Sequence, residues 1–373
     1  MFLKELLLIN YRNYRYQKVV FHPGLNLMIG ENAQGKTNLL ESVYLSARGT
    51  VFKNVREREL IRFGERSAYV RAAIDRNGKQ KTVECKLSMV DRKRVRINEI
   101  EVENLRELSY QFDVVLFSPQ ELRLVQEGPS YRRGYMDSLL QGIDPRYNKE
   151  LGAFERVLYQ RNQLLKGKKD RWFEAQLLTL DQQLTENAYR IVQKRTELVQ
   201  EIQEKAVGFH RKMSGGREIL GVHYETIVPL SNDFKTKMLQ SLIESRDRDL
   251  AQKNTDIGPH KDDLLLTING MPARRYASQG QSRTAALALK WAEVSILEVH
   301  NASAPLLLLD DVFSELDPNR GKQLLTMIRP YQTMITANRL GNLLSEIPGE
   351  NRRIFHICQG VLREETESRR WKE

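Results

Sequence analysis

The stretch GENAQGKT, residues 30–37, decides the fold of this chain. It lies between the apolar run LNLMI at 25–29 and the segment NLLESVYL at 38–45. It fits the pattern G-x-x-x-x-G-K-[ST], whose glycines let the backbone turn tightly and aim its N–H groups at phosphates. Lys36 is then expected to reach the β- and γ-phosphates, and the Thr37 hydroxyl to bind Mg²⁺. A buried strand before the motif and a helix after it favour a nucleotide-binding loop over an unrelated glycine turn.

The composition indicates a folded, basic protein. The chain has 373 residues, and its 59 Lys and Arg against 48 Asp and Glu give a net charge of +11. This balance favours a polyanionic partner such as nucleic acid, with an ordinary basic protein as the alternative. Cys85 and Cys358 lack the spacing of a zinc or redox motif, which indicates a reducing compartment. No stretch reaches the roughly 18 apolar residues of a membrane span, so we expect a soluble, cytoplasmic protein without a membrane partner.

Hydrophobic patterning divides the chain into three segments. Residues 1–118 read as strands with tight turns at 76–78 and 98–99, which predicts an antiparallel β layer. Residues 119–212 have helical periodicity and two long helices broken at 166–169, forming either an antiparallel arm or a helical subdomain in the body of the fold. Residues 213–373 return to strands at 220–228 and 263–270 and then alternate helix and strand. That alternation predicts parallel strands with right-handed crossovers, the last strand being 353–358.

Two acidic residues end the most apolar strand. The run of four leucines at 306–309 is typical of a central strand buried on both faces, and Asp310 and Asp311 follow it. Asp310 is expected to bind Mg²⁺, in part through its water shell, and Asp311 is expected to polarise the attacking water. With Lys36 they form the predicted catalytic set. The alternative is that one carboxylate is a cap and the other has no role.

The segment ASQGQSRTAALALKWAE, residues 277–293, opens an apolar helix about thirty residues before these acids. The Ser278 hydroxyl and the first free N–H groups of such a helix face any anion placed there. Without the double acid downstream, Ser278 would be an ordinary N-cap.

In combination these motifs resemble the ABC-type ATPase heads of the chromosome-maintenance class. The shared features are the phosphate loop, SQGQ at 278–281, LLLLDD at 306–311, SELD at 314–317 and ITA at 335–337. A closer resemblance, to the RecF family of bacterial recombination mediators, is carried by NYRNY at 10–14, GENAQGKTNLLE at 30–41, FSPQELRLVQEGPSYRRGYMD at 117–137 and GPHKDD at 258–263. It covers the whole chain. It implies an α/β, ABC-type P-loop ATPase head with a mixed central sheet, an antiparallel β layer and an inserted helical arm.

The resemblance also implies roles for individual residues. ATP would contact Gly30, Glu31, Asn32, Ala33, Gln34, Gly35, Lys36, Thr37 and Asn38. Ser278, Gly280 and Gln281 would complete the ATP site of a second copy, so that ATP closes a homodimer with Asp317 at its seam. Gln120 would sense the γ-phosphate through the metal, or would be a surface turn residue.

Other positions stay open or depart from the ABC pattern. Arg12 and Asn13 would contact the nucleotide, or would belong to an exposed strand end. Asp311 stands where a glutamate is usual, and Thr336 lies in the run where many ABC ATPases place a switch histidine. Both departures indicate slow hydrolysis. The resemblance gives no mechanism for His260 and Lys261 in GPHKDD.

The function implied by the resemblance is an ATP-dependent DNA-binding protein of recombinational repair and replication restart. ATP would drive dimerisation on duplex or gapped DNA, slow hydrolysis would reset it, and the protein would assist RecA loading with RecO and RecR. Basic residues at 92–96, 132–133, 166–171 and 274–275 would contact DNA without regard to its sequence, or would be solvated faces.

Three alternatives remain for the function. One is a chromosome-maintenance ATPase that organises or processes DNA ends, although such proteins have far longer coiled-coil inserts. Another is the nucleotide subunit of a membrane transporter, where the double acid follows the phosphate loop sooner. The third is a P-loop kinase or GTPase, in which SQGQ would have no purpose.

Overall fold

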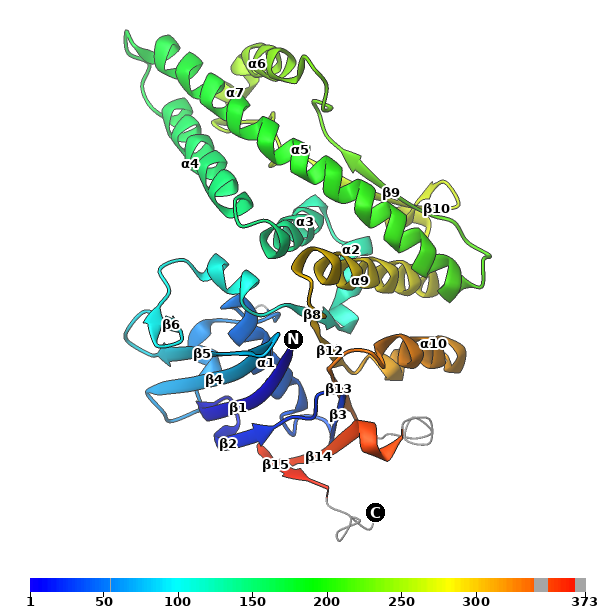
Figure 1. Ribbon diagram of the computed structural model, residues 1–373. Helices are drawn as coiled ribbons and strands as arrows, with labels where there is room; N and C mark the ends of the chain where they lie inside the picture. Colours follow the sequence, from blue (N-terminus) through cyan, green and yellow to red (C-terminus); the bar gives the residue numbers. More distant parts are fainter. Residues whose placement is uncertain (54, 339–347, 366–373) are drawn as a thin grey trace. The chain divides into compact units, whose positions relative to one another are not determined.

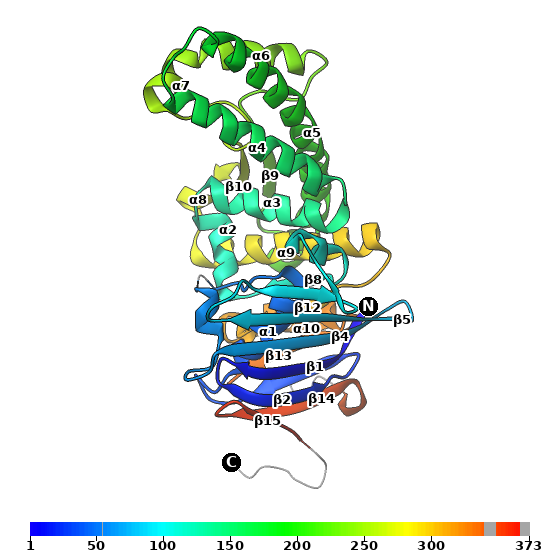
Figure 2. The ribbon, with the colours of Figure 1, turned by 90° about the vertical axis from the view of Figure 1, so that its left-hand side faces the viewer.

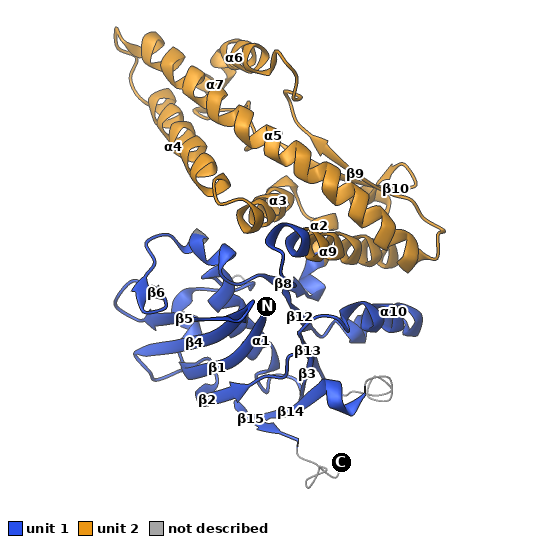
Figure 3. Ribbon diagram, in the orientation of Figure 1, with its two compact units in different colours: residues 1–121, 297–373 blue, residues 122–296 orange. Residues whose placement is uncertain are grey.

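The computed structural model describes residues 1–53, 55–338 and 348–365. The chain forms two compact units (Figure 3): unit 1 comprises 1–121 and 297–373, and unit 2 comprises 122–296. Unit 1 therefore takes both ends of the chain. The division of the chain into the three domains 1–118, 119–212 and 213–373 stays a prediction. Within the described ranges, none of the helices has the length and apolarity needed to cross a membrane.

Unit 1 is built on a six-stranded, mostly parallel sheet in the order β15-β14-β3-β13-β12-β8 (Figure 1). Its strands are β3 (Leu25–Ile29), β8 (Val114–Phe117), β12 (Leu306–Asp310), β13 (Thr333–Ala337), β14 (Arg352–Cys358) and β15 (Val361–Glu364). All neighbouring pairs but β14–β15 are parallel, as the alternation of helix and strand predicts. The four leucines of β12 are fully buried, which confirms a central strand.

The sheet does not end at the strand that the sequence predicts to be the last. Gln359 and Gly360, with φ of 47° and 74°, form a tight turn after β14, and β15 returns antiparallel to it. A two-residue turn with both φ positive matches the twist of a hairpin. The prediction that the strand ending at residue 358 is the last one was therefore wrong, because β15 follows it.

A second, antiparallel sheet forms the β layer predicted for residues 1–118. Its order is β2-β1-β4-β5-β6-β7, with β1 (Phe2–Tyr11), β2 (Tyr14–Val20), β4 (Ser67–Arg76), β5 (Lys79–Ser88), β6 (Arg94–Ile97) and β7 (Ile100–Glu101). The turns at Asn77–Gly78 and Asn98–Glu99 have positive φ, as expected for tight hairpins. Among the residues of unit 1 that the structure describes, no helix lies in front of the outer face of this sheet (Figure 2).

Helix α1 (Lys36–Arg48) joins the two sheets of unit 1. It packs against β4 and β5 of the antiparallel layer and against β8, β12 and β13 of the central sheet. Its buried residues, including Leu39, Leu40 and Val43, belong to one hydrophobic core with both sheets. Because α1 begins inside the phosphate loop, the loop is anchored to this core. Among its described residues, unit 1 also contains the helices η1 (Glu57–Leu60), η2 (Leu105–Tyr110), η3 (Pro119–Leu122), η4 (Val312–Glu315), α10 (Pro318–Ile328) and η6 (Gly349–Asn351).

Unit 2 contains the predicted helical segment. The helices are α2 (Arg123–Gln126), α3 (Pro129–Ile143), α4 (Tyr147–Lys166), α5 (Phe173–Ser214), α6 (Phe234–Glu244), α7 (Arg246–Gln252), α8 (Ala273–Tyr276) and α9 (Gln279–Asn301), whose end reaches into unit 1. The break after Lys166 confirms the predicted division of the long helices. The strands β9 (Leu220–Glu225) and β10 (Asp263–Ile268) pair antiparallel, and β11 (Met271–Pro272) follows. Helices α6 and α7 were not predicted.

The long helices of unit 2 are fixed by a buried charge cluster. Arg161 of α4 is fully buried and pairs with Asp181 of α5 and Asp249 of α7, each at 2.7 Å. Breaking a buried pair of this kind leaves an uncompensated charge in the interior.

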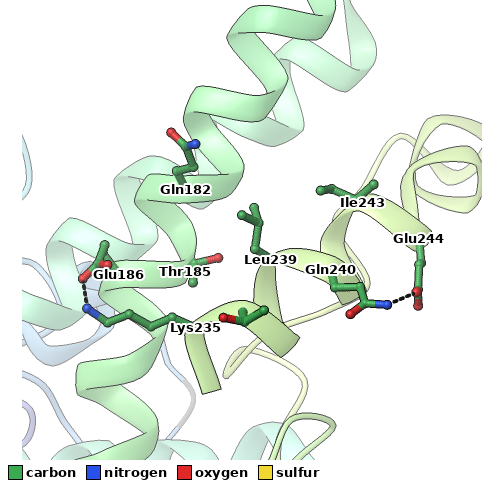
Figure 4. A pocket seen from close by; sticks show the side chains of 9 residues that line it. Gln182, Thr185, Glu186, Lys235, Leu239, Gln240, Ile243 and Glu244 are labelled. Atoms are coloured by element: carbon green, nitrogen blue, oxygen red, sulfur yellow. Dashed lines mark hydrogen bonds and ion pairs between the residues drawn. The ribbon is translucent and has the colours of Figure 1, made fainter. Parts of the chain in front are cut away.

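A cavity of about 750 Å³ lies between α5 and α6, lined by Gln182, Leu239 and Ile243 among others (Figure 4). None of the predicted site residues lines it.

Candidate nucleotide-binding site

The phosphate loop occupies the predicted place between β3 and α1. The Lys36 side chain is buried, and its ammonium donates to the carbonyls of Gly30 and Glu31 and, at 2.6 Å, to Oδ1 of Asn338. Burial lowers the pKa of Lys36, while Asp311 and Asp310 act in the opposite direction. The loop thus holds a lysine ammonium at its centre with the two acids nearby.

Asn338 is a site residue that the sequence interpretation missed. It follows β13, the strand that lies between β3 and β12 in the sheet. Carboxyl ends of parallel strands share one edge, where ligands bind in α/β proteins. A polar residue directly after the apolar strand TMITA was therefore the signal that could have revealed Asn338.

Thr37, Asp310 and Thr336 meet at the same edge. The Thr37 hydroxyl donates to Oδ1 of Asp310 at 2.9 Å, and the Thr336 hydroxyl contacts the same oxygen at 2.9 Å. Asp310 and Thr336 are paired residues of β12 and β13, which places their side chains next to each other. The structure thus brings together the two predicted metal ligands and adds Thr336, which the sequence identified only as the replacement for a histidine.

The donor set fits a magnesium ion. A hydroxyl and a carboxylate are hard oxygen ligands, and Mg²⁺ in nucleotide sites takes one or two of these and fills its shell with phosphate oxygens and water. Among residues 1–53, 55–338 and 348–365, no group of three or more His, Cys, Asp or Glu side chains could hold a metal by itself. Thr37 and Asp310 would supply two ligands of a magnesium ion, and phosphate oxygens and water the others.

Asp311 adopts a left-handed conformation, with φ of 53° and ψ of 21°, immediately after β12. Its N–H donates to the Thr336 hydroxyl at 3.0 Å, so Thr336 contacts both acids. Partial burial raises the pKa of Asp311, and the neighbouring Asp310 adds to this effect. Left-handed geometry is tolerated by aspartate better than by most residues.

The turn between β1 and β2 contacts the phosphate loop. The Asn13 amide donates to the Gln34 carbonyl at 2.8 Å, and its oxygen accepts from Asn38 at 2.9 Å. Arg12, which lies beside it, pairs at 3.0 Å with the fully buried Glu41 of α1. The NYRNY motif therefore supports the loop and the first helix. A cavity of about 1050 Å³ adjoins these residues and is also lined by Arg58, Arg62 and Phe63.

The remaining predicted nucleotide contacts are Ser278, Gly280 and Gln281 in unit 2 and Gln120 in unit 1. Ser278 begins α9 in unit 2, and its hydroxyl accepts from the Gln281 N–H at 3.2 Å while its own N–H donates to the Gln281 side chain at 2.9 Å. This reciprocal pair is a capping box, with Gly280 in the same first turn. Gln120 is half-buried in η3, just beyond the carboxyl end of β8, which neighbours β12. The trans role of the first group and the sensor role of Gln120 stay predictions.

The segment GPHKDD, whose role the sequence left open, is a junction inside unit 2. His260 is largely buried and contacts the Thr255 carbonyl through Nε2 at 2.9 Å, and burial lowers its pKa to about 4. Lys261 pairs with Asp256, and Asp262 accepts from the Tyr224 hydroxyl. Arg195 of α5 donates to the Pro259 carbonyl at 2.7 Å. These contacts give the segment a structural role.

The structure removes one residue from the candidate DNA contacts. Arg132 is only 4% exposed and makes a bidentate pair with Asp263, with both N···O distances at 2.6 Å. Arg133 is half-buried and donates to the Asp262 carbonyl. The expectation was wrong for Arg132, because a bidentate, buried guanidinium is committed to its carboxylate. For Arg133 it stays a prediction. The basic residues at 166–171 and 274–275, and Arg92, Arg94 and Arg96, are exposed.

Three features together define an ABC-type ATPase head. A phosphate loop follows β3, an aspartate ends β12, and helix α1 after the loop packs against an antiparallel sheet as well as the central sheet. A family model described as "RecF/RecN/SMC N terminal domain" matches residues 2–343. The DNA replication and repair protein RecF of Alkaliphilus oremlandii is 38% identical over 97% of this chain and 100% of its own length. The chain belongs to the RecF family.

Further relatives agree with this assignment. RecF of Agathobacter rectalis is 38% identical over 96% of this chain and 98% of its own. A solved structure of the recombination mediator protein RecF with ATP, in the RecFOR pathway, is 34% identical, covers 98% of each chain and has a TM-score of 0.89. The Smc head domain of Pyrococcus furiosus, at 16% identity and a TM-score of 0.57, shows the common fold alone.

Proposed function

We propose that this protein binds ATP at residues 30–38 and Mg²⁺ at Thr37 and Asp310, and that it hydrolyses the ATP slowly. The observation that carries the proposal is the 2.9 Å contact between Thr37 and Asp310, next to the buried ammonium of Lys36. These groups would bind the metal and the β- and γ-phosphates. The solved RecF–ATP complex, a relative over almost the full chain, supports this assignment.

The hydrolytic step would be carried by the two acids in different ways. Asp310 would hold the metal's coordination together with Thr37, and Asp311 would orient and polarise the attacking water. An aspartate is one methylene shorter than the glutamate of faster ABC ATPases, which supports slow turnover. Thr336 would position both acids through its hydroxyl, since it contacts Oδ1 of Asp310 and the N–H of Asp311.

ATP would also bring two copies of the chain together. Ser278 caps α9, and Gly280 and Gln281 lie in its first turn, where free N–H groups and the positive end of the helix dipole favour an anion. The Ser278 side chain is exposed. In a closed homodimer this turn would contact the γ-phosphate held by the loop of the second copy, with Asp317 at the seam and Gln120 sensing the same phosphate.

The closed dimer would bind double-stranded or gapped DNA. One row of side chains crosses the outer face of the antiparallel sheet through directly opposed pairs, in the order Tyr16, Ile9, Tyr69, Lys86 and Arg94. Tyr16 is 63% exposed, and Lys86 and Arg94 are exposed beside Arg96. Cations attract phosphates without reading the sequence, so binding should weaken steeply with salt.

Within the cell this activity would serve recombinational repair and replication restart. The names of the RecF relatives, and the RecFOR pathway of the solved complex, support RecO and RecR as partners in RecA loading. A chromosome-maintenance ATPase is the alternative. The near full-length relatives at 34–38% identity favour the mediator.

The deciding experiment is to measure DNA binding and molecular mass together. The protein would be mixed with gapped, single-stranded and blunt duplex DNA, each with ATP, ADP or a non-hydrolysable ATP analogue, at two salt concentrations. The proposal expects a dimer on duplex-containing DNA with ATP or its analogue and dissociation with ADP. Nucleotide-independent, monomeric binding would contradict it.

A further inference from the structure

Three segments that are distant in the sequence interlock at Gln34 of the phosphate loop. The Gln34 carbonyl accepts from the Asn13 amide at 2.8 Å and from the N–H of Gly360 at 3.1 Å. The Gln34 side chain accepts from the N–H of Gln359 at 2.7 Å. Asn13 lies in the β1–β2 turn, and Gln359 and Gly360 form the β14–β15 turn. The Gln34 carbonyl thus contacts both hairpin turns, and its side chain contacts the β14–β15 turn.

The interlock is tight enough to require glycine at two positions. A Cβ on Gly35, whose φ is 116°, would lie 2.5 Å from Nδ2 of Asn13. A Cβ on Gly360, whose φ is 74°, would lie 2.2 Å from the Asn13 carbonyl oxygen. Both positive φ values and both close approaches favour glycine. The Gly35 requirement thus comes from the neighbouring turn as well as from any phosphate.

The next peptide group is held from the same side. The Tyr14 hydroxyl, on a fully buried ring, donates to the Gly35 carbonyl at 2.9 Å. The N–H of Leu39 donates to the same carbonyl at 3.0 Å as the first bond of α1. Two consecutive carbonyls of the loop therefore accept from Asn13 in the β1–β2 turn and from Tyr14, the first residue of β2.

Fixing a carbonyl also fixes the N–H of the same peptide group. In a trans peptide the C=O and the following N–H point in opposite directions, and the described chain has no cis bond. With the Gln34 and Gly35 carbonyls held toward the hairpin turns, the N–H groups of Gly35 and Lys36 point away from those turns. These are the N–H groups that a loop of this pattern offers to phosphates.

We propose that Asn13, Tyr14 and Gln34 are positioning residues that hold the loop in its phosphate-binding form before nucleotide arrives. The inference rests on the proposed ATP binding and deepens it, since it makes nucleotide affinity depend on two hairpin turns outside the motif. A pre-formed site avoids the entropy of ordering the loop on binding. The β14–β15 hairpin, which the sequence did not reveal, belongs to the site in this way.

The test compares Asn13→Ala, Tyr14→Phe and Gln34→Ala with the wild type. Asn77→Ala is the matched control, because Asn77 occupies a tight turn of the same sheet with φ of 53° and lies between β4 and β5. ATP affinity would be measured by calorimetry, and hydrogen exchange would be measured without nucleotide at the Leu39 and Gly360 amides, which donate to the Gly35 and Gln34 carbonyls. Thermal unfolding of each variant would report whether the fold is retained.

Loss of one or two hydrogen bonds should weaken ATP binding about tenfold in Asn13→Ala and by less in Tyr14→Phe, where Leu39 still holds the carbonyl. Exchange at Leu39 and Gly360 should be faster in both, and unchanged in Asn77→Ala. Unchanged exchange in Asn13→Ala would overturn the inference whatever the ATP result. A wild-type protein that binds no ATP would instead overturn the proposed function, while the exchange data would still decide the inference.

Discussion

The hydroxyl of Thr37 lies 2.9 Å from the carboxylate of Asp310, although 273 positions separate the two residues in the chain. The contact exists because β3, β13 and β12 are neighbouring parallel strands, so that their carboxyl ends lie at one edge of the sheet. Thr37 follows β3 through the phosphate loop, and Asp310 ends β12. Thr336 of β13 bridges the gap by contacting Oδ1 of Asp310 and the N–H of Asp311. The geometry of the proposed catalytic centre thus depends on a residue in the strand between its two halves.

Thr336→Val should slow ATP hydrolysis while leaving ATP binding nearly intact. Valine matches threonine in shape but removes the hydroxyl that positions both acids, and it leaves the Asp311 N–H without this acceptor. We expect a tenfold or larger fall in kcat at saturating Mg²⁺ and ATP. Thr333→Val, in the same strand, is the control, because the Thr333 hydroxyl bonds the Tyr331 carbonyl instead. Equal kcat in the two variants would argue against positioning by Thr336.

Asp311→Asn should separate binding from hydrolysis. The amide keeps the size of the side chain and tolerates the left-handed backbone, but it cannot take a proton from water. The variant should bind ATP and remain dimeric in ATP for much longer than the wild type, as light scattering over time would show. Hydrolysis at the wild-type rate would rule out Asp311 as the base.

Lys36→Ala and Ser278→Ala should have different defects. Removing Lys36 takes away the ammonium at the centre of the loop and should abolish ATP binding. Removing the Ser278 hydroxyl should leave ATP binding largely intact and eliminate ATP-dependent dimerisation, which sizing with and without ATP measures. Because Ser278 also caps α9, its loss should cost about 1 kcal/mol of stability.

A second variant must separate the loss of stability in Ser278→Ala from the loss of the contact to the second copy. Ser278→Asn keeps a good N-cap but replaces the hydroxyl, so it should restore the melting temperature without restoring the dimer. An ATP-dependent dimer that persists in Ser278→Ala would contradict the model in which each copy completes the other's site.

Mild acid should destabilise the protein through His260. Its pKa is about 4 in the folded state, whereas an unfolded histidine titrates near 6.5. Between these values the unfolded chain binds a proton that the folded chain excludes, so stability falls as pH falls, by about 2 kcal/mol at pH 5. Urea unfolding of His260→Gln should show less loss between pH 7 and pH 5. His223→Gln, at an exposed position, should retain the wild-type slope.

The basic residues should divide into two groups by the effects of their replacement. Arg94→Glu with Arg96→Glu should weaken duplex DNA binding and reduce its salt dependence, with stability almost unchanged. Arg132→Ala should instead lower stability by about 3 kcal/mol, because it leaves Asp263 without its bidentate partner. Chemical unfolding and DNA titration at two salt concentrations distinguish the two. Lys149→Glu with Arg156→Glu, an exposed double charge reversal outside the four basic clusters, is the charge-matched control for DNA binding.

Local patterns in the sequence were enough for several elements. The hairpins at Asn77–Gly78 and Asn98–Glu99 and the break after Lys166 depend on turn chemistry within a few residues. Helices α6 and α7 were missed because both are short, and short helices depend on packing rather than on strong periodicity. The turn at Gln359–Gly360 was missed for a similar reason, since β15 has only four residues.

By itself the sequence determined that a phosphate loop follows a buried strand, that Asp310 ends another, and that the combination belongs to an ABC-type head. Strand order, which no local pattern encodes, was decided by the tertiary structure. It brought Thr336 and Asn338 to the site between Thr37 and Asp310, and it placed Asn13 and the β14–β15 turn against Gln34. It also committed Arg132 to a buried carboxylate. The physical reason is that motif chemistry depends on neighbours along the chain, whereas pairing and burial depend on contacts across it.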